Sequence, residues 1–447
     1  MDQSSFLQTA TDVTGHLSGL LWNNPLTLFV LLGTGVFLTL RLRLIQLRAF
    51  FPAMEHLATN RKAGDGEISH AQALSTALSA TIGTGNIAGV ATAISFGGPG
   101  ALFWMWVTAF LGMATKFTEA TLAVNYREMD ENGHYFGGPM YTLRKGMNSP
   151  MLGGAFAFFA FVASFGIGNM VQANSVVDGL TYLSRGLEHY RWLMGLILAM
   201  LTGMVILGGI RRIAAVTSAL VPLMAILYFF AALTCLVLQY QAVPSALHSI
   251  FEQALNPWAA GGGAIGQAIR WGVARGLFSN EAGLGSSPIA HATARTPYPA
   301  REGLIAMLEP FFDTLVICSL TGLVIITSGV LSSGEYTGAA LTAHAFSASL
   351  GSAGGWVVGV SLSLFAFSTI IAWSYYGETS ARYLFGSRSS LPYRLLFCIA
   401  VALGAAIPLK LVWNVADIFN LFMAFPNIVG LWFLSRLAIK QESDGLI

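Results

Sequence analysis

The sequence predicts an all-α polytopic membrane protein with about eleven transmembrane helices, in which two inverted repeats of five helices follow one extra N-terminal helix. Of its 447 residues, 55% are hydrophobic and only 10% are charged, whereas a soluble domain carries about 25% charged residues. Two Gly-rich interruptions fall inside membrane-length apolar segments, and the basic residues gather on one predicted side of the membrane. Together these observations exclude a soluble globule, and a net charge of +2 excludes a basic nucleic-acid-binding protein.

Eleven apolar segments are candidate spans, and most have the 17 to 25 residues that a bilayer requires. The first twenty residues hold no Lys or Arg and include Asp2 and Asp12, so we expect the first segment to remain as a helix rather than act as a signal peptide. The predicted spans are 20–40, 72–96, 101–124, 152–180, 192–209, 213–238, 264–289, 303–330, 354–384, 394–408 and 412–434.

The basic residues predict the orientation. Of the Lys and Arg residues outside the spans, seventeen fall on one side and only three, Arg185, Arg191 and Lys410, fall on the other. Cytoplasmic loops carry such an excess of basic residues. We therefore expect an integral protein of the plasma (inner) membrane with its N-terminus outside and its C-terminus in the cytoplasm.

The positions of the two interruptions predict the domain organisation. The spans 72–96 and 264–289 each begin a group of five and run in opposite directions, which is the pattern of an inverted repeat. We expect an N-terminal region with the extra helix, a first repeat, an external connection containing a short amphipathic helix in HSIFEQALNPW, a second repeat and a cytoplasmic tail. These regions are 1–70, 71–240, 241–263, 264–436 and 437–447.

The interruptions themselves are SATIGTGNIAGVATAISFGGPG at 79–100 and GLFSNEAGLGSS at 276–287, and Asn86–Gly89 aligns with Asn280–Gly283. Backbone groups freed inside lipid must line a cavity or bind something. Paired interruptions in two halves are typical of a secondary transporter with its site near the midplane. The alternative is a Gly-rich packing face such as Gly85 with Gly89. A dinucleotide-binding loop is excluded, since no strand precedes the run.

Three segments carry a resemblance to a known family. IGTGNIAGVATAISFGGPGALFWMW with KFTEATLAVNYRE, and GLFSNEAGLGSSPIAHA, resemble the two signature regions of the alanine or glycine:cation symporter family. The resemblance implies the leucine-transporter fold and sodium-coupled uptake of small neutral amino acids, such as alanine and glycine, by alternating access. Proton coupling on the same fold is the alternative. A channel is a distant alternative, because it would need a continuous ring of polar groups and not two Gly-rich breaks. A membrane enzyme is equally distant, because no nucleophile with its base and no metal-ligand spacing is visible.

An interrupted helix suits an amino acid, since its N–H groups bind a carboxylate and its carbonyls bind an ammonium group. By resemblance, Phe278 and Trp373 form a lid that admits little more than a methyl group, and Gln172 faces the substrate. A lone membrane amide such as Gln172 can instead make an interhelical hydrogen bond. The candidate substrate residues are Thr81, Gly83, Thr84, Gly85, Gln172, Phe278, Thr369 and Trp373.

Sodium, the co-transported ion, is expected at hydroxyl and carbonyl oxygens. The resemblance assigns it to Ser368 and Thr369 with the carbonyls of Ser79 and Ile82. Both hydroxyls could instead bond their own helix. A second set of candidate ligands is Asn86, Ser279 and Glu309.

Buried charges must be paired in a membrane. The spacing predicts that Lys116 pairs with Glu119 at i and i+3. For Arg275 we expect an ion pair with Asp313, a structural contact. Glu309 could alternatively carry a proton.

Overall fold

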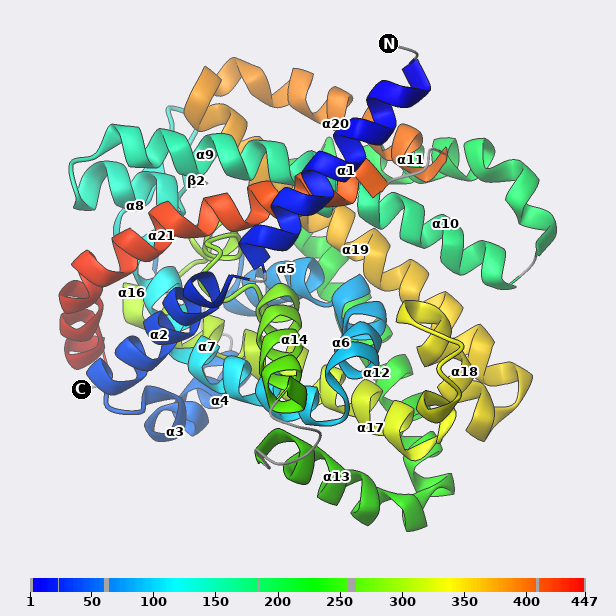
Figure 1. Ribbon diagram of the computed structural model, residues 1–447. Helices are drawn as coiled ribbons and strands as arrows, with labels where there is room; N and C mark the ends of the chain where they lie inside the picture. Colours follow the sequence, from blue (N-terminus) through cyan, green and yellow to red (C-terminus); the bar gives the residue numbers. More distant parts are fainter. Residues whose placement is uncertain are drawn as a thin grey trace.

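The computed structural model describes residues 3–22, 24–59, 64–183, 185–255, 263–406 and 410–445, and these residues are almost entirely helical (Figure 1). A helix lies on each of the eleven predicted ranges. Within the described residues, seven helices are long and apolar enough to cross a membrane, or up to nine if each of two bent pairs is one span. The all-α membrane class is therefore confirmed, while the number of eleven spans stays a prediction.

The first half of the chain contains the N-terminal helices and the first interruption. Its elements are α1 Gln3–Trp22, α2 Pro25–Arg41, α3 Ile45–Arg48, α4 Phe50–Thr59, α5 His70–Thr81, η1 Gly85–Gly89, α6 Val90–Gly97, α7 Gly100–Asn125, β1 Glu128–Met129, β2 Tyr135–Phe136, α8 Pro139–Gly146, α9 Pro150–Phe165, η2 Gly166–Met170, α10 Val171–Leu183, η3 Arg185–Tyr190, α11 Arg191–Ile206, α12 Gly209–Leu238, η4 Tyr240–Ala242 and α13 Val243–Leu255.

The second half contains the second interruption and the longest helices. Its elements are α14 Gly263–Asn280, α15 Pro288–His291, α16 Pro299–Ala306, η5 Phe311–Cys318, α17 Ser319–Thr327, η6 Val330–Ser333, α18 Gly338–Leu350, α19 Ser352–Phe385, η7 Ser387–Ser389, α20 Ser390–Ala406 and α21 Lys410–Gly445. Residues 256–262 of the predicted connection, 407–408 of the tenth span and 446–447 of the tail lie outside the described residues.

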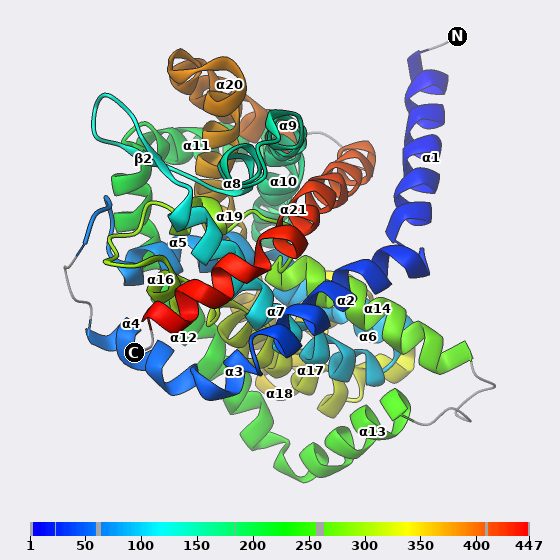
Figure 2. The same ribbon diagram turned by 90° about the vertical axis from the view of Figure 1, so that its left-hand side faces the viewer.

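Several helices lie wholly or largely outside the eleven predicted spans, among them α1 and α18. The N-terminal helix α1 begins at Gln3, well before the first apolar segment, and stands at the edge of the molecule beside α21 (Figure 2). Trp22 Nε1 donates to the carbonyl of Asp417, at 3.1 Å, and so ties α1 to α21. Helix α18 lies in a predicted loop and buries Leu341, Ala345 and Phe346. With 13 residues α18 is too short to cross a membrane by itself, and α1 qualifies as a span only together with α2.

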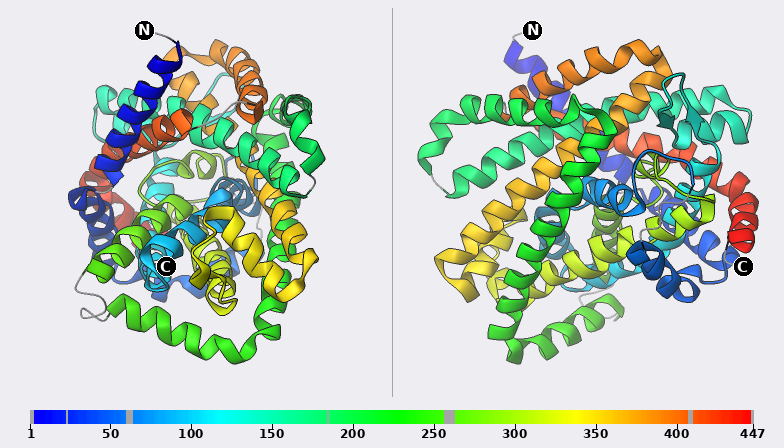
Figure 3. Two further views of the ribbon diagram at one scale, coloured as in Figure 1. Left: turned by 45° about the vertical axis from the view of Figure 1, so that its right-hand side comes forward. Right: turned by 180° about the vertical axis from the view of Figure 1, so that it is seen from behind.

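The predicted amphipathic helix in the connection is confirmed as α13, which buries Ala246, Ile250 and Ala254 at four-residue spacing. At the centre of the molecule, α19 packs against α10 and α12, and the view from behind shows α12 beside it (Figure 3). Gly179 and Gly359 let α10 and α19 approach closely, since a Cβ on either would lie 3.0 Å from the carbonyl oxygen of the other. This contact places Gln172 of α10 near Thr369 of α19.

Candidate functional site

The first interruption begins where helix α5 ends. This helix begins with a capping box, in which Ser69 and Gln72 bond each other's backbone. It ends where Ile82 leaves the helical region with φ −74° and ψ 88°. The halves α5 and η1–α6 are bent by 52°. The freed amide of Gly83 donates to Asn86 Oδ1 at 2.9 Å, so the break carries its own hydrogen bond.

Several predicted substrate residues meet beside this break. A Cβ on Gly83 would lie 2.8 Å from Thr369 Oγ1 and 3.8 Å from Gln172 Oε1. Gln172 Nε2 donates to the carbonyl of Ile167, at 3.0 Å, and lies 3.4 Å from Thr84 Oγ1. A carbonyl accepts only, so this contact fixes the amide orientation. Gln172 Oε1 is buried and has no hydrogen-bond partner among the residues that the structure describes.

The two expected lid residues contact different elements. A Cβ on Gly85 would lie 3.5 Å from Cδ1 of Phe278, so this ring covers η1. Trp373 is almost fully buried, and a Cβ on Gly168 of η2 would lie 2.4 Å from its side chain. The hydroxyl of Thr81 lies 3.3 to 3.4 Å from carbonyls of its own helix. The structure therefore places Phe278 at the break and Trp373 against η2, and it turns the Thr81 hydroxyl toward α5.

The expected ion ligands form a cluster of oxygens between α5 and α19. Thr369 Oγ1 lies 3.0 Å and Ser368 Oγ 3.3 Å from the carbonyl oxygen of Ser79. Each hydroxyl is also within 3.0 Å of the carbonyl of Phe365 in its own helix. Each hydroxyl has one proton, which it can donate either to the Ser79 carbonyl or to the Phe365 carbonyl. At the other contact, the lone pairs of the hydroxyl oxygen and the carbonyl oxygen face each other. Ile82, whose carbonyl is the remaining expected ligand, lies at the C-terminal end of α5.

The second interruption separates α14 from α15. Glu281, Gly283 and Gly285 have φ values of +53°, +89° and +83°, and this left-handed backbone ends the helix. Such a conformation is uncommon for Glu281, a non-Gly residue. The Glu281 side chain bonds Ser286 within the same loop. The paired interruption that the sequence predicted is thus present in the structure.

One carboxylate joins the two interruptions, and the sequence did not reveal this role. Asp313 Oδ1 accepts from Asn86 Nδ2 at 2.7 Å, and Asp313 Oδ2 accepts from Ser279 Oγ at 2.8 Å. Thr314 donates to the same Oδ2 at 2.7 Å. Two members of the second candidate ion set, Asn86 and Ser279, therefore meet at Asp313 and not at Glu309.

The predicted ion pair between Arg275 and Asp313 is wrong. Among the described residues, the Asp313 carboxylate accepts hydrogen bonds from three neutral side chains and forms no ion pair. The Arg275 guanidinium instead lies 5.6 Å from the ring centres of both Trp271 and Phe278. Arg275 and Asp417 line the same cavity of about 220 Å³. Arg275 lies one turn of α14 before Ser279, the residue that Asp313 bonds, and so lines this cavity instead of meeting Asp313.

Lys116 pairs differently from our expectation. Its Nζ lies 2.9 Å from Glu309 and 2.6 Å from Ser287 Oγ. Glu119 instead accepts from Asn427 Nδ2 at 2.6 Å. Because the Glu309 carboxylate is held by Lys116, the structure places it in an ion pair and away from the candidate ion ligands Asn86 and Ser279.

Two histidines extend this ion pair into an inner network, which we define as Lys116, Glu309, His291, Glu302 and His70. His291 Nε2 lies 2.6 Å from Glu309, and His291 Nδ1 lies 2.6 Å from Glu302. Glu302 also bonds His70. The sequence did not reveal this network, because His70 and His291 lie far apart in the chain and show no ligand spacing.

A charged cavity of about 450 Å³ lies next to the β1–β2 hairpin. Glu67 accepts from the backbone of Tyr135 at 2.8 Å and lies 2.9 Å from His134 Nδ1. Burial raises the pKa of Asp130, but hydrogen bonds from the backbone of His134 and from the Arg382 guanidinium outweigh it, and the pKa lies below the ordinary value. The hairpin is thus bound to the segment before α5 and to the end of α19.

Two interrupted helices that meet at buried polar groups inside an all-α membrane protein define a secondary transporter. The solved structure of MhsT in complex with L-phenylalanine is similar in fold, with a TM-score of 0.55 at 12% identity over 84% of this chain and 98% of that chain. This likeness shows the leucine-transporter fold. The model of the sodium:alanine symporter family matches residues 7–444, and the chain belongs to this family.

The relatives agree with this membership. The sodium/alanine symporter AgcS of Methanococcus maripaludis is 49% identical over 93% of this chain and 93% of its own length. The amino-acid carrier protein AlsT of Bacillus subtilis is 39% identical over 93% and 88%. The probable sodium/glutamine symporter GlnT of the same species is 36% identical over 98% and 91%. The expected function, a secondary active amino-acid symporter and not an enzyme, is therefore confirmed.

Proposed function

We propose that this protein carries alanine, glycine and similar small neutral amino acids into the cell together with sodium. The observation that carries the proposal is Gln172 Oε1 beside the first interruption, a buried acceptor for which the described part of the chain supplies no donor. A buried unsatisfied group costs about 1–3 kcal/mol. An ammonium group bound at this position would supply the missing donor.

The space at the break supports a small substrate. Gly83 lies so close to Thr369 that a single added carbon at Gly83 would clash, and that carbon would also contact Gln172 Oε1. The substrate carboxylate would bind backbone N–H groups at the start of η1, where a helix N-terminus favours negative charge. Phe278 and Trp373 would cover the side chain. Alanine then fits, and leucine does not.

For sodium we propose two sites. The first uses Ser368 and Thr369 with the carbonyls of Ser79 and Ile82, since a hard cation prefers such oxygens. With both hydroxyls donating to Phe365, their lone pairs would point at the ion. The second uses Asn86 and Ser279, and we assign its carboxylate to Asp313 in place of Glu309. Two clusters of oxygen ligands beside one substrate site would couple the binding of sodium to the binding of the amino acid.

The proposed orientation has the N-terminus outside and the C-terminus in the cytoplasm of the inner membrane. It is supported by the excess of basic residues, seventeen against three, on one side of the predicted spans. Cysteine labelling of Lys410 and of Arg436 replaced singly would test it, because the two positions are expected on opposite sides.

The experiment that tests the function uses purified protein in proteoliposomes. Uptake of labelled alanine is measured with a sodium gradient alone and with a proton gradient alone. We expect uptake with sodium and little with protons, and competition by glycine but not by leucine. Uptake driven by the proton gradient without sodium would instead support the proton-coupled alternative.

A further inference from the structure

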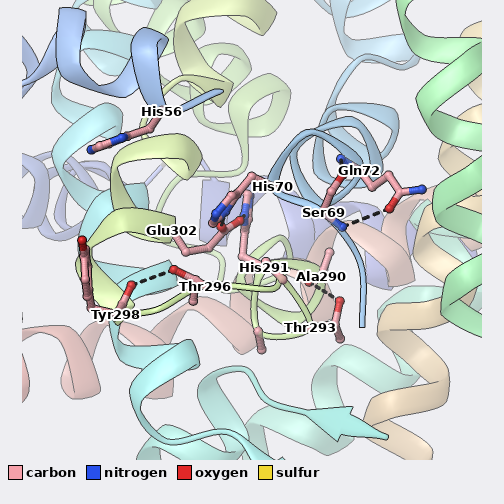
Figure 4. Close-up of polar contacts among 12 residues, drawn as sticks. His56, Ser69, His70, Gln72, Ala290, His291, Thr293, Thr296, Tyr298 and Glu302 are labelled. Carbon is pink, nitrogen blue, oxygen red and sulfur yellow. Dashed lines mark hydrogen bonds and ion pairs between the residues drawn. The ribbon is translucent and has the colours of Figure 1, made fainter. Parts of the chain in front are cut away.

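Glu302 of α16 is fully buried and binds two histidines from distant parts of the chain. Its carboxylate bonds His70, at 1% exposure, and His291, at 0% exposure. Figure 4 shows both imidazole rings directed at this carboxylate. His70 is the first residue of α5, and His291 is the last residue of α15. One carboxylate therefore joins the halves of the two interrupted helices that lie on the same side of the breaks.

The backbone joins the same two halves. The segment before α5 and the segment after α15 run side by side, with Glu67 N donating to Thr293 O at 2.8 Å and Arg295 N donating to Ile68 O at 2.8 Å. Bridges pair residues 65 with 296 and 68 with 294. Arg127, at the end of α7, donates to carbonyls of both segments. Separating the halves would break all these bonds.

The inner network continues the connection to α7. His291 bonds Glu309, and Glu309 pairs with Lys116. Every member is buried, so removing one leaves an uncompensated charge. Nothing in the substrate or ion clusters contacts Glu302 among the described residues. Its position is therefore better suited to transmitting motion than to binding a transported species.

We propose that Glu302 is a positioning residue of the transport cycle, which fastens α5 to α15 so that they move as one unit. The opposite end of α5 carries Ser79 and Ile82, so an ion bound there would act on α15 through this attachment. Coupling of this kind needs a contiguous element with two arrangements that both sites bias. The inference rests on the proposed transport function.

A cross-link tests the unit directly. Residues paired across an antiparallel bridge have Cα atoms about 4.5–5.5 Å apart, which suits a disulfide. Asp65→Cys with Thr296→Cys is therefore oxidised in proteoliposomes, and each single Cys variant serves as the control. We expect sodium-driven alanine uptake to stay within about twofold of the reduced sample, far less than a typical coupling change of 5–150-fold.

Loss of uptake on oxidation, restored by reductant, would show that α5 and α15 separate and would overturn the proposal. The reduced sample reports separately on the proposed function. If the folded, reduced protein takes up no alanine, the proposed transport function fails, whereas the proposed attachment of α5 to α15 does not. A link of Glu67→Cys to His134→Cys provides a contrast, because it joins the segment before α5 to the hairpin, and we expect oxidation to inhibit that variant.

A second variant tests Glu302 itself. For Glu302→Gln we expect kcat, counted per folded protein, to fall by about tenfold while KM for alanine and for sodium stays within about twofold. The count of folded protein is needed because unfolding alone also lowers the uptake rate at an unchanged KM. The 65–296 disulfide should restore turnover, since it replaces the lost fastening. Unchanged kcat, or a loss that the disulfide does not restore, contradicts the proposal. Glu119→Gln is the matched buried carboxylate, whose effect the disulfide should leave unaltered.

Discussion

Gly83→Ala is the sharpest test of the small space at the first interruption. The added Cβ would lie 2.8 Å from Thr369 Oγ1, closer than real Cβ atoms approach another atom, so Thr369 has to move. Thr369 Oγ1 is also 3.0 Å from the Ser79 carbonyl. We therefore expect one methyl group to disturb both the substrate and the ion cluster. The backbone itself tolerates Ala, because Gly83 does not have a positive φ.

The size of the effect follows from packing. Overpacking a dense interior costs about 1–3 kcal/mol. Since about 1.4 kcal/mol corresponds to a factor of ten in affinity, we expect the half-saturating concentration of alanine to rise by about five- to 150-fold. The sodium requirement should rise with it. Uptake by proteoliposomes at several sodium concentrations, with counterflow of labelled alanine, measures both quantities.

Gly89→Ala is the matched control. Gly89 ends the same η1 segment, and a Cβ there would meet nothing within 4 Å. Its half-saturating alanine concentration should stay within about twofold of the wild type, well below the change expected from overpacking. If Gly83→Ala kept the wild-type value, or if both variants lost affinity equally, the substrate would not bind at this contact.

The other predictions concern neighbouring groups. Ser368→Ala with Thr369→Ala should raise the sodium concentration for half-maximal uptake by about tenfold or more, and an unchanged sodium titration would remove both residues from the ion site. Phe278→Ala or Trp373→Ala should let leucine compete with labelled alanine and weaken alanine itself, whereas unaltered competition would mean that the rings do not set substrate size. Asp313→Asn removes a charge that three donors share, so it should lower sodium affinity by about tenfold, and a loss of thermal stability alone with normal sodium affinity would assign it a structural role.

Local chemistry made the interruptions predictable from the sequence. A Gly-rich polar run in a membrane-length apolar segment has few physical solutions, so the breaks after Thr81 and after Asn280 could be read directly. The same holds for α13, whose apolar residues repeat every four positions. The helix α1 could not be predicted in this way, because its stability comes from contacts with α21 and not from its own composition.

Pairing between distant residues was beyond the sequence. Lys116 has an acidic residue three positions away, yet it pairs with Glu309 because the approach of α7 to the end of α16 decides the distance. Likewise, Arg275 and Asp313 are complementary by charge, but Asp313 of η5 accepts from Ser279, one turn of α14 beyond Arg275. Spacing rules hold within one helix. Across helices the register depends on packing that a single sequence does not specify.

Asp313 and Glu302 together explain why the two interrupted helices form a mechanical unit. Asp313 bonds Asn86 and Ser279 at the breaks, whereas Glu302 bonds the histidines at the far ends of α5 and α15. At a rise of about 1.5 Å per residue, the eleven steps from His70 to Thr81 place the Glu302 attachment about 16 Å from the first break. Glu302 therefore holds the halves α5 and α15 together, and Asp313 holds η1 and α14 together on the other side of the breaks. Because both pairs of halves are attached, a change at the ion cluster near Ser79 is transmitted to α15 and not absorbed by α5 alone.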